Sequence, residues 1–118
     1  MIRASSLALL LMAGLAQAQS VKEAPRAELR WLDKVSGATA DVEMARGQSA
    51  AWCRLTIQLN SCRYPVDNAS GEAYANLTIR DSLQTEPVFN GWMVASAPAL
   101  SALDHARYDV WVLRCLTE

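Results

Sequence analysis

Residues 87–115 read PVFNGWMVASAPALSALDHARYDVWVLRC, and this stretch decides the fold of the chain. It holds two of the four Trp and the single His. Two apolar runs typical of β-strands, residues 88–95 and 108–116, flank an Ala/Leu-rich segment. That segment, residues 98–103, is the one helix candidate, because it opens with a Pro and Ser96 suits a cap. The stretch therefore predicts a strand, a corner and a second strand.

The first residues predict a secretory signal at positions 1–18. Arg3 supplies the positive start, residues 7–15 form an apolar run, and Ala16-Gln17-Ala18 is a small-residue cleavage site. The apolar run is too short for a bilayer, which takes roughly 20 apolar residues. We expect cleavage after Ala18 and an exported mature chain without a membrane span.

The mature chain has the size of one domain with a single hydrophobic core. Residues 19–26 are polar and without periodicity, which predicts a flexible N-terminal arm before a β-domain at 27–118. Loss of Arg3 with the signal changes the formal net charge from −1 to −2. The basic residues stand singly, whereas phosphate binding needs them in clusters, so nucleic acid is not an expected partner.

Alternating apolar and polar residues predict four further strands, at about 28–31, 38–44, 53–60 and 74–80. With the two runs around the helix candidate, this makes about six strands joined by short turns. Apolar residues of both parities at 110–113 predict that the last strand is central in its sheet. The sequence therefore predicts an all-β fold, either a small single-domain β-sandwich or a partly open barrel, with one short helical turn.

The three cysteines are Cys53, Cys62 and Cys115. An exported chain is expected to form one disulfide and to leave one thiol. Cys53 and Cys62 are nine steps apart on one extended run, which is too far for a bond between them. A bond from Cys62 to Cys115 would instead close a long loop, worth about 4 kcal/mol in the chain-entropy model.

The parity of the 53–60 strand makes separate predictions for the first two cysteines. It turns Cys53 toward the core with Leu55 and Ile57, so we expect a buried thiol. It turns Cys62 to the polar face unless the register changes first. We therefore expect a β-bulge or a strand end near Ser61.

Several separate motifs resemble one known family. They are Leu32-Asp33-Lys34-Val35-Ser36-Gly37, Cys62, Gly91-Trp92-Met93, Ser96-Ala97-Pro98-Ala99-Leu100, His105, Tyr108-Asp109-Val110-Trp111 and Cys115. In this order and spacing the chain resembles the DUF2155 family of small exported proteins, known chiefly from alphaproteobacteria. The resemblance implies a periplasmic location and a disulfide between Cys62 and Cys115, with Cys53 outside the family's motifs.

A catalytic Ser-His-Asp set can be written from Ser101 or Ser96, His105, and Asp104 or Asp109. The chain has no Gly-x-Ser-x-Gly elbow for an exposed nucleophile, and these residues lie on a corner between strands. We therefore expect His105 to hold the corner closed by hydrogen bonds. Zinc or copper would need further His or Cys ligands, so we predict no metal site and no cofactor.

Most aromatic residues are expected in the core of a small β-domain. Trp52 differs, because parity places it with Arg54 and Thr56 on the polar face of its strand. Together with Trp92 and Tyr64 it forms our candidate binding surface.

Asp33 shares parity with the apolar residues Leu29 and Trp31. A carboxylate on that face is buried and needs a partner. Lys34 cannot be this partner, because adjacent strand residues point to opposite faces.

These features favour a non-enzymatic periplasmic module that binds another envelope component, expected to be a protein, through a sheet edge and an aromatic surface. One form of this hypothesis is an accessory component of an envelope or inner-membrane assembly. The alternative is a small periplasmic hydrolase or ligand-binding protein centred on His105, Asp109 and Ser96. An exposed His105 in a cleft with Ser or Asp within reach would favour the alternative, whereas a turn-capping His105 would favour the module.

Overall fold

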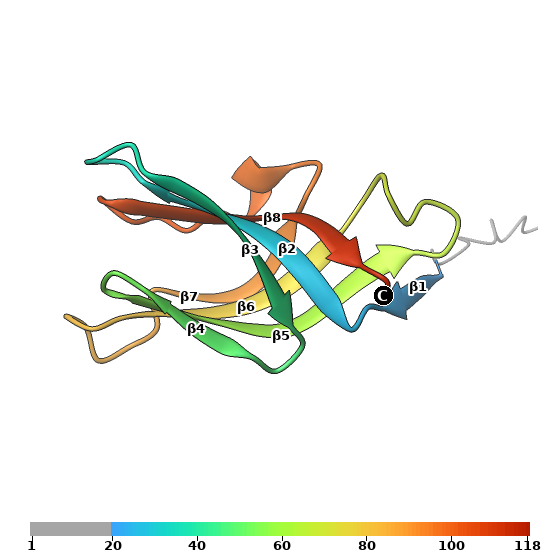
Figure 1. Ribbon diagram of the computed structural model, residues 1–118, viewed down its shortest axis with the longest axis horizontal. Coiled ribbons are helices and arrows are strands. Elements are labelled where there is room, and N and C mark those ends of the chain that lie inside the picture. Colours follow the sequence, from blue (N-terminus) through green and yellow to red (C-terminus); the bar gives the residue numbers. More distant parts are fainter. Residues whose placement is uncertain (1–19) are drawn as a thin grey trace, which may run out of the picture.

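The computed structural model describes residues 20–118, which form a sandwich of two antiparallel β-sheets (Figure 1). The predicted signal, residues 1–18, lies outside the described residues. The strands are β1 (Val21–Glu23), β2 (Arg26–Asp33), β3 (Thr39–Ala45), β4 (Ser49–Trp52), β5 (Leu55–Pro65), β6 (Tyr74–Asp81), β7 (Phe89–Val94) and β8 (Tyr108–Leu116). A 3-10 turn, η1 (Pro98–Leu100), is the helical element of this part of the chain. The all-β class and the sandwich are confirmed, with eight strands in the described residues in place of the expected six.

The large sheet has five strands and the small sheet has three within residues 20–118. In the large sheet β5 pairs with β6 along one edge, and β6 pairs with β7. The other edge of β5 is shared by β4 and β1. In the small sheet β2 lies between β3 and β8. The prediction of a central last strand is therefore wrong, because β8 is an edge strand of the small sheet.

The apolar residues on the two faces of β8 have different neighbours. Val110 and Val112 are buried between the sheets, and Trp111 lines a hollow together with Pro98 and Ala102 of the loop before this strand. Apolar residues on both faces therefore do not require a paired strand at both edges. Ser96 does not cap η1, whose N-cap residue Ala97 makes no side-chain hydrogen bond.

The segment predicted as a flexible arm contains the first strand. Val21 to Glu23 pairs with β5, and the Ala24 N–H donates to the Cys62 carbonyl at 2.7 Å. Ala24 is buried, and the chain then passes to the small sheet at Pro25. Three residues are too few for alternation to be visible in the sequence, and this strand is held by backbone bonds.

A tight turn separates β4 from β5 where the sequence predicted one continuous strand. Cys53 and Arg54 form this turn, and Cys53 adopts a left-handed conformation with φ of 53°. Trp52 and Leu55 are cross-strand partners, so both side chains lie on the inner face. Cys53 is a free, exposed cysteine, and the prediction of a buried thiol is wrong. The chain reverses at Cys53, so the alternation along β5 does not extend to this residue.

Exposure of Cys53 predicts one reactive thiol in the native protein. We expect a maleimide reagent to add once to the folded, non-reduced chain, because Cys62 and Cys115 are bonded to each other. Intact mass measurement after labelling checks this, and a Cys53→Ser variant should take up no reagent. A folded wild-type protein that stays unlabelled would contradict the exposed position.

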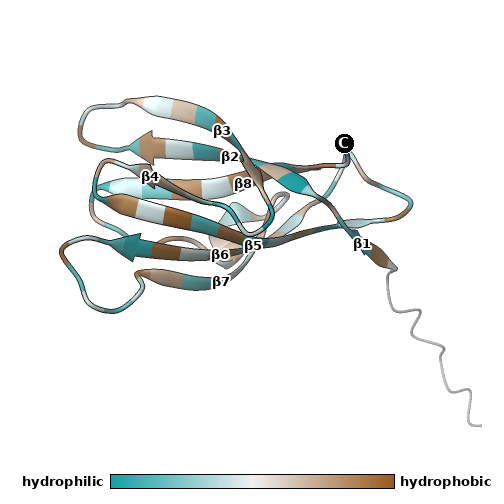
Figure 2. Cartoon of the chain, turned by 60° about the horizontal axis from the view of Figure 1, so that its bottom comes forward, coloured by the Kyte–Doolittle hydropathy of each residue, from teal (hydrophilic) through white to brown (hydrophobic). Residues whose placement is uncertain are grey.

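The core fills the space between the two sheets. Its fully buried strand residues include Leu29, Leu55, Ile57, Leu59, Leu77, Ile79, Val110 and Val112. Hydrophobic and hydrophilic bands alternate along the strands (Figure 2). The register of β5 and β6 shifts between Leu59 and Ser61, as predicted, and this bulge turns Cys62 into the core.

Candidate functional site

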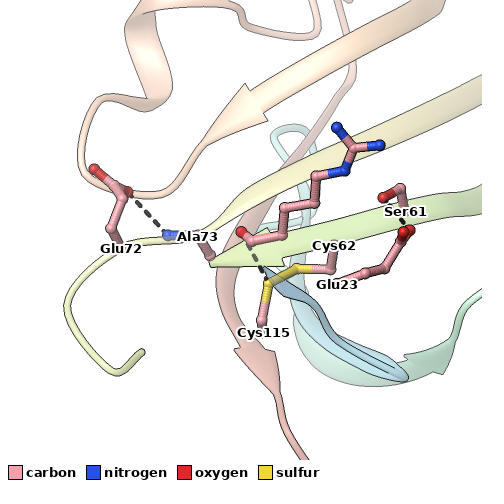
Figure 3. The surroundings of a disulfide bond; sticks show 7 residues. Glu23, Ser61, Cys62, Glu72, Ala73 and Cys115 are labelled. Carbon is pink, nitrogen blue, oxygen red and sulfur yellow. Dashed lines mark hydrogen bonds between the residues drawn. A yellow bond between two sulfur atoms is a disulfide. The ribbon is translucent and has the colours of Figure 1, made fainter. Parts of the chain in front are cut away.

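A disulfide between Cys62 and Cys115 joins the two sheets (Figure 3). Cys62 lies on β5 of the large sheet and Cys115 on β8 of the small sheet, with 5.8 Å between the Cα atoms. Both cysteines are buried. Ser61 donates a hydrogen bond of 2.5 Å to Glu23 beside the bridge, and this bond lowers the pKa of the Glu23 carboxyl. The structure thus contains the pairing that the family resemblance implies, and the bond holds the frame together.

His105 closes the corner at the other end of β8. Its Nδ1 accepts hydrogen bonds from the backbone N–H groups of Arg107 at 3.0 Å and Tyr108 at 3.2 Å. The ring proton therefore lies on Nε2, which donates to Asp81 Oδ2 at 2.8 Å. The side chain is 8% exposed. His105 is a turn-capping residue, as the sequence predicts.

Asp81 is the acceptor at the centre of this corner. Its pKa is lowered first by the His105 hydrogen bond and then by the Leu83 N–H, with a smaller contribution from the Arg54 guanidinium. Arg54 lies 3.2 Å from Asp81 Oδ2. Sequence reasoning missed Asp81 and Arg54 as partners, because each lies far along the chain from His105 and no local pattern marks them.

The structure places Asp104 at the same hollow as His105 but does not bring either candidate serine or Asp109 there. Ser96 donates to Glu72 Oε2 at 2.5 Å, and Asp109 lines the hollow beside η1. A separate hollow of about 470 Å³ lies at His105, and neither Ser96 nor Ser101 lines it. The Ser-His-Asp hypothesis gains no support from these contacts, because His105 Nε2 bonds to Asp81 on β6 and no candidate serine lines the hollow beside the ring.

Asp33 was expected to need a partner, and the structure shows that this partner is Arg107. The guanidinium lies 3.1 Å from Asp33 Oδ2, and the Val35 N–H donates to Oδ1 at 2.9 Å. These bonds, of which that of Arg107 contributes most, lower the pKa of Asp33 from 3.8 to about 2. The neighbouring Lys34 turns away and donates to the His105 carbonyl at 2.5 Å. The Arg107–Asp33 ion pair and the bond from Lys34 to His105 therefore connect the corner before β8 to the end of β2.

The Asp33 carboxylate predicts a loss of stability in acid. A carboxyl whose pKa is lower in the folded chain stabilises the fold above its unfolded pKa, and this contribution is lost as the pH falls. We expect the urea midpoint of wild type to fall as the pH drops from 3.8 toward 2. In Asp33→Asn the decline across this window should be shallower, from a lower starting stability. Asp104→Asn, at an exposed position, is the control; equal slopes in wild type and Asp33→Asn would overturn the assignment.

Two of the three aromatic residues predicted as a binding surface lie elsewhere. Trp52 packs between Trp31 and Tyr108, with ring centroids 5.7 and 5.8 Å away. Tyr64 follows the bulge on β5, is half-buried, and packs against the core. The β4–β5 turn places Trp52 on the inner side, and the bulge does the same for Tyr64.

Trp92 is the predicted surface residue that the structure leaves exposed. Its exposed fraction is 40%, and the Arg63 guanidinium lies over its ring at 5.0 Å from the centroid. A shallow hollow of about 230 Å³ is lined by Val21, Arg63, Tyr74 and Trp92, which we call the Trp92 patch. This patch lies on the outer face of the large sheet, and its residues come from β1, β5, β6 and β7.

The outer face of the small sheet has a different chemistry. It carries ion pairs between Arg26 and Glu43, Arg30 and Asp41, and Arg114 and Glu28, at 2.9, 2.8 and 2.8 Å. The two charges of each pair neutralise one another. Exposed ion pairs of this kind contribute little to the free energy of folding. The Trp92 patch is therefore the better candidate for a contact surface.

Residues 20–118 contain neither a cluster of metal ligands nor a long apolar helix. No three His, Cys, Asp or Glu side chains in this part of the chain gather in an arrangement that could hold a metal ion. No helix among these residues is long and apolar enough to cross a bilayer. The described geometry offers a disulfide-tied sandwich with a closed corner and an exposed aromatic patch.

The fold and the bridge define a small, disulfide-linked β-sandwich domain, and comparison with known proteins places it in a family. A family model described as "Uncharacterized protein conserved in bacteria (DUF2155)" matches residues 27–115, so the chain belongs to the DUF2155 family. It is similar to Uncharacterized protein RP359 of Rickettsia prowazekii (strain Madrid E), with 25% identity over 87 residues. That match covers 71% of this chain and 56% of the relative's length, so the chain spans little more than half of that protein. No solved structure matches the chain.

Proposed function

We propose that this protein is a non-enzymatic periplasmic module that binds another component of the cell envelope through the Trp92 patch. The observation that carries the proposal is the Trp92 ring on the outer strand face, 40% exposed and held by Arg63. Aromatic residues are enriched at contact surfaces, and Trp and Arg often dominate their binding energy. An accessory role in an envelope or inner-membrane assembly, with a protein as the component bound, stays the prediction from the sequence.

The alternative, a hydrolase centred on His105, has less support. Both ring nitrogens of His105 are engaged, one by two backbone N–H groups and the other by Asp81. A general base needs a nitrogen within reach of a nucleophile, and neither Ser96 nor Ser101 lines the hollow beside this ring. The bonds of His105 support a structural role.

Capture from periplasm tests the proposed surface. Immobilised wild type, Trp92→Ala and Trp111→Ala proteins are incubated with periplasmic and solubilised envelope extracts, and bound components are identified by mass spectrometry. Trp111 is the matched control, since it is a partly exposed Trp on a strand of the other sheet. We expect a component that binds wild type and Trp111→Ala and is lost with Trp92→Ala. Equal capture by all three proteins would count against the surface.

The periplasmic location has its own test. If the predicted signal is removed after Ala18, protein purified from the periplasmic fraction begins at Gln19. Intact mass measurement decides this directly. A periplasmic protein that retains residues 1–18, or a protein confined to the cytoplasm, would show the prediction to be wrong.

A further inference from the structure

We propose that the Trp92 patch binds a glycan chain of N-acetylated hexosamines. This inference rests on the proposed function and names the class of envelope component. It is drawn from the polar residues that border the patch, from the exposed ring, and from the small size of the patch.

A row of neutral polar side chains runs across the large sheet beside the patch. Asn60 Nδ2 donates to Asn76 Oδ1 and to Thr78 Oγ1, both at 2.9 Å, and Thr78 Oγ1 donates to Asn90 Oδ1 at 3.2 Å. Asn76 and Trp92 are cross-strand partners, so the row and the ring are neighbours on one face. The row is thus fixed in place by its own hydrogen bonds and adjoins the aromatic ring.

These bonds leave part of each amide available. Within residues 20–118, the amino groups of Asn76 and Asn90 and the Asn60 carbonyl oxygen have no partner. Amide side chains both donate and accept, which matches sugar hydroxyls and the N–H and C=O of an acetamido group. The row carries no charge, unlike the outer face of the small sheet with its ion pairs. A neutral, hydrogen-bonding ligand fits this row best.

The Trp92 ring supplies the apolar half of such a site. A sugar ring has an apolar C–H face that can pack on an aromatic plane, and the indole presents a large, rigid surface for it. The Arg63 guanidinium lies over one face of this ring, so a sugar would pack on the part of the ring that Arg63 leaves exposed. Val21 adds an apolar side chain to the hollow that is 42% exposed and suits an acetamido methyl group. The patch therefore offers apolar contact next to directed hydrogen bonds, which is the combination that an N-acetylated sugar needs.

The hollow is small and has polar borders. Val21, Arg63, Tyr74 and Trp92 line it, and the Asn and Thr side chains of the row lie beside it. A single glycan strand contacts only a few side chains per sugar, so it fits a hollow of this size.

Titration with two soluble oligosaccharides tests the inference. The first probe is the pentamer of N-acetylglucosamine, and the second is maltopentaose, which has the hydroxyls but no acetamido group. Binding is followed by ¹H–¹⁵N chemical shifts of folded wild type, Trp92→Ala, Asn76→Ala and Trp111→Ala. We expect shifts confined to β1, β5, β6 and β7 with the first probe. Affinity should be at least about tenfold weaker in Trp92→Ala and Asn76→Ala and unchanged in Trp111→Ala.

Other outcomes overturn the inference in distinguishable ways. An absence of shifts with the first probe up to about 10 mM would refute it. Equal binding of maltopentaose, or undiminished binding by folded Trp92→Ala, would also refute it. If the glycan fails but Trp92→Ala alone loses a protein in the capture experiment, the proposed function stands and the ligand class is wrong. If Trp92→Ala loses nothing in either experiment, both fail.

Discussion

Replacing Cys62 and Cys115 together by Ser is expected to lower the free energy of unfolding by about 4 kcal/mol. The bridge joins residues 53 apart in sequence, and loops of this length are worth about that much in the chain-entropy model. A small domain has a total stability of roughly 5 to 15 kcal/mol, so a large part of it depends on one bond. In thermal melts the midpoint should fall by about 15 to 30 °C.

The matched control is Cys53→Ser, which removes the free cysteine. Its melting midpoint should equal that of wild type, and wild type in reductant should melt like the variant that lacks Cys62 and Cys115. A double variant as stable as wild type would show that the two sheets hold together without the bridge.

Replacing His105 by Ala is expected to destabilise the protein by about 3 kcal/mol. The substitution leaves the N–H groups of Arg107 and Tyr108 without their acceptor and removes a donor from the buried Asp81. Losing a buried hydrogen bond costs about 1 to 3 kcal/mol, and the bonds of one network are not additive. Denaturant unfolding of the variant beside wild type gives the difference.

Asp104→Ala is the control for His105, since it changes an exposed neighbour on the same loop. Its free energy of unfolding should stay within about 0.5 kcal/mol of wild type, as for most surface substitutions. If His105→Ala is as stable as wild type yet abolishes a cellular phenotype, the residue has a functional role and the hydrolase alternative regains support.

The sequence predicted the parts of the fold that depend on local pattern. Alternation located the strands that bury Leu29, Ile57 and Leu77, because one face of each strand must be apolar where sheets pack. The bulge near Ser61 was predicted because Cys62 otherwise faced the wrong side. Each of these inferences needs only residues that are close together in the chain.

The parts that the sequence did not predict depend on backbone conformation or on distant partners. Nothing in the residue types marks Cys53 as a left-handed turn position, since such positions usually hold Gly, Asn or Asp. Because of that one turn, Trp52 lies on the inner face and packs against the core, not on the polar face. For the candidate site, Trp92 was named as a candidate surface residue, but its stacking with Arg63 joins two strands that are far apart in sequence.

The position of β2 sets the order in which this chain can assemble. β2 lies between β3, which follows it directly, and β8, the last of the described strands. The pairing of β2 with β8 joins Arg26 to Leu116 and Asp33 to Tyr108, so it closes a loop over most of the domain. Contacts of such high sequence separation slow folding, because the loop must close before they form.

The hairpins of the large sheet, by contrast, pair strands that are consecutive from β4 to β7. They can form before β8 pairs with β2. Until β8 arrives, one edge of β2 stays unpaired, and such an edge can recruit strands of other chains. The pairing of β8 therefore both completes the small sheet and ends the period in which a partly folded chain is exposed to association.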